Sequence, residues 1–146
     1  MDSIVVMESG AHWPAWVDRE AGAVSNVVIL ARQRDESAAE FEARAWERLA
    51  QVAELGSPKR GILVTGPAGR DVTRCRRGLL RALVEVVRRA GGGEVVCVGE
   101  QERALSDELM AHVRKLNLRD REGTGLVRLR FRCSEPVGVL PETRVA

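Results

Sequence analysis

The chain has 146 residues, of which 45% are hydrophobic and 30% charged, a balance that excludes a disordered polypeptide and supplies enough apolar surface for one closed core. The formal net charge is only +2, so attraction to an acidic partner must come from local clusters of charge rather than from the whole molecule. Residues 1–146 are therefore predicted to form a single domain.

The cysteines indicate a reducing compartment. Cys75, Cys97 and Cys133 are widely spaced, form no C-x-x-C pair and leave one over in any disulfide scheme. The first residues show neither the basic end nor the long apolar stretch of a signal peptide, and no segment reaches transmembrane length. We expect a cytoplasmic protein that does not associate with membranes.

Short apolar runs predict the strands. Ser3–Met7 is the first, and residues 8–25 after it carry the turn residues of a long connection. Three later runs, at residues 27–31, 62–64 and 95–98, contain no alternating polar residues. Such runs are typical of strands buried on both faces, which occur where helices cover both sides of a parallel sheet.

Longer segments between these runs have apolar residues at helical spacing. The first predicted helix covers residues 36–55, begins with acidic residues that its dipole favours, and ends before Gly56-Ser57-Pro58. The second covers residues 71–90 and ends at Gly91-Gly92-Gly93. Its predicted buried stripe comprises Val72, Cys75, Leu79, Leu83, Val86 and Ala90.

A third helix is predicted to begin at Ser106, as the residue that caps its N-terminus, and to run to about residue 116. The last strand, over residues 126–131, differs from the others because apolar residues alternate in it with Arg128, Arg130 and Arg132. A row of arginines suits an edge strand, since charge discourages pairing with other chains.

The predicted class is α/β: a single three-layer domain with a mostly parallel central sheet of about five strands and about three helices, STAS-like or Rossmann-like. The strands at 26–32, 61–65 and 95–98 are expected to form the interior of the sheet. Residues 134–146 are expected to form a loose tail.

The order strand-strand-helix-strand-helix-strand-helix-strand resembles the STAS domain, the family of anti-sigma-factor antagonists and sulfate-transporter tails. The resemblance covers residues 27–131, and Gly92-Gly93-Glu94-Val95-Val96-Cys97-Val98 echoes the family's strand after its second helix. It implies a non-catalytic regulatory or protein-interaction module. In Cys75-Arg76-Arg77-Gly78, the nearest match to the family's phosphorylation motif, Arg76 stands where the family has its acceptor serine.

Arginines on the second helix are the predicted contact with a partner. Arg74, Arg77 and Arg81 are spaced so that their guanidinium groups project from one side. Arginine is favoured at protein interfaces because its planar group makes paired contacts with carboxylates. We expect an acidic protein partner rather than nucleic acid, since few aromatic residues accompany the arginines and no helix-turn-helix pattern is evident. A solvated helix face is the simpler alternative.

A second resemblance points to a nucleotide. Gly66-Pro67-Ala68-Gly69, followed by Gly78, looks like the glycine spacing of ATP-binding universal stress proteins, although eight residues rather than nine separate Gly69 from Gly78. Backbone amides before a helix can cradle phosphates. This alternative assigns phosphate binding to Gly66, Gly69 and Arg70 and ATP as ligand, whereas an ordinary strand-to-helix turn also explains the glycines.

Enzyme and metal signatures are lacking in the sequence. Cys75 falls on the apolar stripe of its helix, where a thiol is inert. Acidic residues follow several strands, but no Asp-x-Asp or histidine-rich spacing accompanies them. We therefore predict neither a catalytic residue nor a metal site, and the sequence does not determine an oligomeric state.

Overall fold

The computed structural model describes residues 3–8, 27–55, 58–65, 70–99 and 103–132. The predicted connection over most of residues 8–25, the glycines Gly66 and Gly69, and the predicted tail at 134–146 lie outside the described residues.

The described elements follow in the predicted order. The strands are β1 (Ser3–Met7), β2 (Val27–Ala31), β3 (Arg60–Val64), β4 (Gly93–Val98) and β5 (Val127–Arg132). The helices are α2 (Ala38–Leu55), α3 (Arg70–Arg89) and α4 (Arg103–Arg119). The predicted α/β class, with five strands and three helices, is confirmed.

All five strands are parallel and lie in the order β2-β1-β3-β4-β5. The prediction that the arginine-bearing strand lies at an edge is confirmed for β5. The prediction that the strand at 26–32 lies in the interior is wrong, because β2 is the other edge and β1 takes the interior place. An apolar run shows that a strand is buried, whereas its place in the sheet depends on the connections to other strands. Here α2 connects β2 to β3 across β1, which leaves β2 at the edge.

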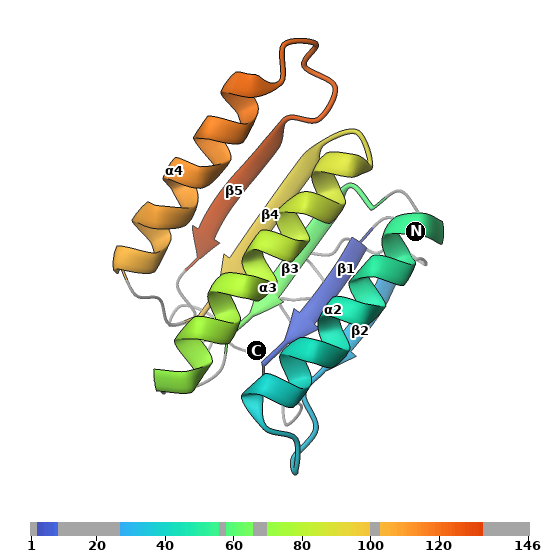
Figure 1. Ribbon diagram of the computed structural model, residues 1–146, viewed down its shortest axis with the longest axis vertical. Coiled ribbons are helices and arrows are strands. Elements are labelled where there is room, and N and C mark those ends of the chain that lie inside the picture. Colours follow the sequence, from blue (N-terminus) through green and yellow to red (C-terminus); the bar gives the residue numbers. More distant parts are fainter. Residues whose placement is uncertain (1–2, 9–26, 56–57, 66–69, 100–102, 133–146) are drawn as a thin grey trace, which may run out of the picture.

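Three helices cover one face of the sheet (Figure 1). Alternate side chains of the strands, such as Ile4, Leu63 and Val95, share one core with apolar residues of α2, α3 and α4. The opposite face carries a second apolar cluster, formed by Val5, Met7, Ile62, Val96 and Val98, which is also buried. Both faces of the interior strands are therefore buried, and the described residues form two of the three predicted layers, the sheet and the helices on one face of it.

The middle helix, α3, lies between α2 and α4 and contacts the sheet as well (Figure 1). The predicted stripe residues Cys75, Leu79, Leu83 and Val86 are buried. So are residues beside that stripe, namely Arg76, Leu80, Ala82, Val84 and Val87. A helix packed on three sides buries a wider arc than the single stripe that helical spacing predicts.

Helix α4 begins at Arg103, three residues before the predicted start. Ser106 therefore does not cap it, because Leu105 is buried in the core and draws the preceding turn into the helix. Helix α2 has a cap that the sequence analysis missed: Glu40 N–H donates to Ser37 Oγ, and Ser37 N–H donates to Glu40 Oε1. This reciprocal pair is a capping box.

The arginine row of β5 meets a carboxylate on the face opposite the helices. Arg128 and Arg132 are exposed, and Arg130 Nε lies 2.7 Å from Glu94 Oε2. Glu94 also accepts a hydrogen bond from Arg60 Nη2 at 2.8 Å. Arg130 and then Arg60 lower the pKa of Glu94, so this carboxylate links β3, β4 and β5.

Candidate functional site

The carboxyl ends of the parallel strands meet at one edge of the sheet, where domains of this kind bind ligands. The chain continues from β1 to β2 on one side and from β3 to β4 on the other, so the direction of winding reverses between β1 and β3. Glu8 follows β1 at this switch point, and its N–H donates to Val64 O of β3 at 3.0 Å. A ligand site in this fold is expected beside Glu8.

Glu8 is bound by an arginine of α3. Arg76 Nε and Nη2 donate to the two carboxylate oxygens of Glu8, each at 2.7 Å. The two side chains are only 2% and 5% exposed. A bidentate pair of this kind satisfies both charges in a place shielded from water. The pair therefore joins α3 to the end of β1, with the charge of each side chain neutralised by the other.

Cys97 lies in the same environment. Its thiol is buried, and this burial raises its pKa to about 12, although the charge of Arg76 acts in the opposite direction. A neutral thiol at this depth is a poor nucleophile. Cys75 is buried as well, as predicted from its place on the apolar stripe.

Beside the pair, the ends of β3 and β4 are joined by Thr65. Thr65 N–H and Oγ1 donate to Val98 O at 2.8 and 3.0 Å. Gly99 follows with a φ of 126°, and a side chain there would collide with Thr65. The polar groups here thus bind one another.

The residues predicted to bind phosphate are only partly described. Gly66 and Gly69 lie outside the described residues, and Arg70 is the first residue of α3. Gly78, the further glycine of the universal stress protein spacing, lies in the contact between α2 and α3, where a Cβ would meet Glu42 and, at 3.7 Å, Trp46 Nε1. The glycine therefore faces α2 side chains, and only the flexible end of Glu42 stands in the way of a Cβ.

The three predicted partner-binding arginines lie together on α3, and we call them the arginine ridge. Arg74 is exposed, and the side chains of Arg77 and Arg81 are 42% and 47% exposed. Arg77 Nε lies 2.9 Å from Glu108 Oε2 of α4, but its N–H is not aligned for a hydrogen bond, whereas Arg81 Nη2 donates to the same oxygen at 3.4 Å.

Among the described residues, no group of three or more His, Cys, Asp and Glu side chains is arranged to hold a metal ion. Within the described ranges, no helix combines the length and apolar character needed to cross a bilayer.

Sequence reasoning missed the Glu8–Arg76 pair, although one signal was present. Arg76 precedes Leu79 by three residues and Leu80 by four, which places it on the buried side of α3. A buried arginine requires a carboxylate, but the separation of 68 residues from Glu8 gives no local pattern to identify that partner.

The fold and the site define a parallel α/β domain with a closed ion pair at its switch point. Comparisons with protein-family models, curated proteins and solved structures found no match.

Proposed function

We propose that this protein is a non-catalytic regulatory module of STAS-like type, which binds an acidic protein partner through the arginine ridge. The observation that carries the proposal is the excess of positive charge there. Two guanidinium groups, those of Arg77 and Arg81, share the single carboxylate of Glu108, and Arg74 adds a third.

The geometry of the ridge supports this role. Each guanidinium has five N–H donors, so a shared contact with Glu108 leaves donors for further carboxylates. The helix that bears the ridge is fixed by buried residues on its other sides, such as Leu79 and Leu83. A rigid helix reduces the entropy lost when a partner binds.

The switch point supports a binding role without catalysis. Glu8, the carboxylate best placed to act on a ligand, is held by Arg76, and Cys97 is a buried neutral thiol. Neither group is prepared to act as a base or a nucleophile.

The test is the triple variant Arg74→Glu, Arg77→Glu, Arg81→Glu. We expect it to lose the proteins that the wild type captures from native lysate, with little change in thermal stability, because exposed ion pairs contribute less than about 1 kcal/mol. The matched control reverses three exposed arginines elsewhere, Arg34, Arg48 and Arg121, with the same change in net charge. Capture of the same proteins by wild type and ridge variant contradicts the proposal.

A nucleotide-binding module that resembles universal stress proteins is the second candidate. It is favoured by the sheet order, which brings the end of β3 to the switch point. The residues predicted to bind phosphate follow β3 in the sequence. Under this alternative, Gly69→Val blocks approach of a phosphate to the backbone, and Arg70→Ala weakens binding more modestly. Unchanged ATP titrations in both variants exclude it.

A further inference from the structure

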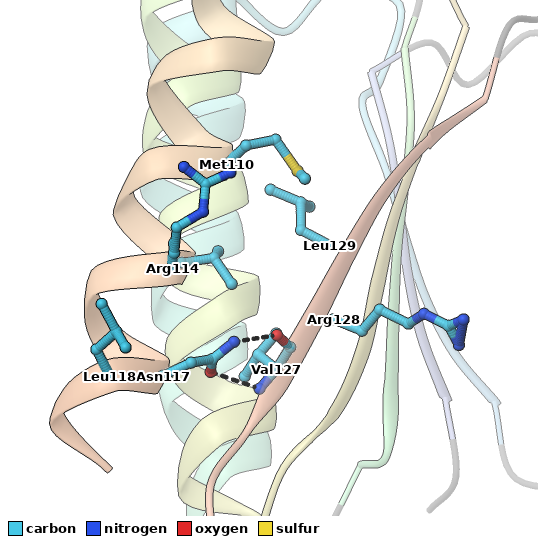
Figure 2. Close-up of a pocket in the computed structure, with 8 residues that line it drawn as sticks. Met110, Arg114, Asn117, Leu118, Val127, Arg128 and Leu129 are labelled. Atoms are coloured by element: carbon cyan, nitrogen blue, oxygen red, sulfur yellow. Dashed lines mark hydrogen bonds between the residues drawn. The ribbon is translucent and has the colours of Figure 1, made fainter.

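A groove lies between α4 and β5 at the outer edge of the sheet (Figure 2). Its volume is about 310 Å³. The residues that line it are Met110, Val113, Arg114, Asn117, Leu118, Val127, Arg128 and Leu129. Figure 2 shows the α4 side chains and Leu129 on one side of the sheet and Arg128 on the other. The groove is thus an apolar channel under α4, bordered by the edge strand.

The backbone of β5 is occupied at one end of this groove. The amide of Asn117 binds both backbone groups of Val127: its Nδ2 donates to Val127 O at 2.8 Å, and its Oδ1 accepts from Val127 N–H at 2.9 Å (Figure 2). A side chain thus takes the place of a neighbouring strand at this residue.

Further along β5, no described residue pairs with the outer edge. Leu126 O and Arg132 O accept hydrogen bonds from β4, so the even-numbered residues face β4 and the odd-numbered ones face outward. The outward N–H and C=O groups of Leu129 and Phe131 therefore have no hydrogen-bond partner among the residues that the structure describes. These four groups, spaced by two residues, match the pattern that an added strand would bind.

The two sides of this edge differ in chemistry. On the α4 side, Met110 and Leu118 are exposed large apolar residues, at 39% and 78%. Arg114 is the charged residue that α4 contributes to the described lining. On the opposite side, β5 carries Arg128, Arg130 and Arg132, of which Arg130 is bound to Glu94 of β4. No acidic residue is among the described groove residues.

We propose that the α4–β5 edge binds an extended segment of a partner protein, in which apolar and acidic residues alternate, as a sixth strand. Side chains of an added strand alternate between the two faces. One set enters the groove beside Met110 and Leu118, and the other becomes the cross-strand neighbours of the arginine row, where opposite charges stabilise pairing. The alternation of β5 itself thus specifies the alternation of its partner.

Charge opposes pairing of β5 with β5 of a second copy of this chain. Pairing of β5 with another β5 would bring two rows of Arg128, Arg130 and Arg132 side by side, and like charges in facing strands destabilise the pair. This inference concerns a different surface from the arginine ridge and does not depend on it.

The test uses an acetylated and amidated peptide of four Val-Glu repeats as probe, and a peptide with Lys in place of Glu as its control. Hydrogen exchange of backbone amides is followed by NMR on the full chain. We expect saturating acidic peptide to slow exchange at Leu129 and Phe131 by at least about tenfold. Val127 provides an internal control, because Asn117 already binds its N–H, and the Lys peptide should leave all three unchanged.

The double variant Arg114→Glu, Leu118→Glu changes two exposed groove residues and should weaken the affinity of the acidic peptide by at least about tenfold. Arg48→Glu, on α2, should not. Four outcomes overturn the proposal. The first two are no binding of the acidic peptide at about 1 mM and equal binding of this peptide by the wild type and the groove variant. The other two are a dimer of the wild type that the groove variant abolishes and tighter binding of a peptide with the sequence of residues 134–146. The last two assign the edge to a second copy or to the chain's own tail.

Discussion

Removal of Arg76 should destabilise the protein more than removal of any exposed charge. In Arg76→Met the apolar side chain fills much of the same volume, but it leaves the carboxylate of Glu8 buried without the two 2.7 Å hydrogen bonds that it accepts. Breaking a buried pair in this way costs about 3–5 kcal/mol. Since domains of this size are stable by only about 5–15 kcal/mol, the loss is a large fraction of the total.

The magnitude is measured by a double-mutant cycle. Urea denaturation gives the free energy of unfolding of the wild type, Arg76→Met, Glu8→Leu and the double variant. We expect each single variant to lose about 3–5 kcal/mol and the double variant to recover most of it, because two apolar groups leave no uncompensated charge. Glu108→Gln, which breaks the exposed ridge contacts, should cost less than about 1 kcal/mol. If Arg76→Met lowers the free energy of unfolding by less than about 1 kcal/mol, the Glu8 carboxylate is not left buried without compensation, and the explanation is wrong.

Three further predictions follow from single residues. Gly78→Ala should raise the free energy of unfolding by up to about 1 kcal/mol, because alanine favours a helix and only the flexible end of Glu42 must move; a loss larger than about 1 kcal/mol in thermal or urea unfolding would contradict this. Hydrogen bonds from Arg44 lower the pKa of Glu36 from 4.5 to about 2, so the stability from this group is present above pH 4.5 and is lost as the pH falls toward 2. The melting temperature of Glu36→Gln should therefore fall less over this range than that of the wild type, and equal falls would count against the assignment. Burial raises the pKa of Cys97 to about 12, so at about pH 8 iodoacetamide should alkylate this thiol in the unfolded protein and not in the folded one. Peptide mapping that finds Cys97 alkylated in the native protein would contradict this.

The local elements could be predicted because each depends on a short pattern. Apolar runs identified the interior strands β3 and β4, and the alternation of arginines with apolar residues identified β5 and its edge position. Gly91 and Gly92 follow the end of α3 with φ angles of 102° and 91°, a conformation that glycine adopts readily. These features involve neighbours in sequence, and the structure confirms them.

The order of the strands could not be derived in the same way. β2 has the apolar composition of an interior strand but lies at an edge, while β1 lies in the interior of the sheet, between β2 and β3. A strand's composition records how much of it is buried, whereas its neighbours follow from the route of the connecting helices.

The candidate site was predicted only in part. The arginine ridge follows from helical spacing, and the structure places Arg74, Arg77 and Arg81 on an exposed side of α3. The common contact of Arg77 and Arg81 with Glu108 joins two helices, and the bond from Asn117 to Val127 joins a helix to a strand. Such tertiary contacts depend on the path of the whole chain, which residue spacing does not determine.

Native mass spectrometry of the protein freshly purified from its own cells tests most directly the claim that it acts by binding another protein. We expect a complex with a second protein that dissociates as the salt concentration rises, since screening weakens contacts between exposed charges. The variant with all three ridge arginines changed to glutamate should not form this complex. Detection of the chain with only the added mass of a nucleotide, and the loss of that added mass in Gly69→Val, would contradict the claim that the protein acts by binding another protein.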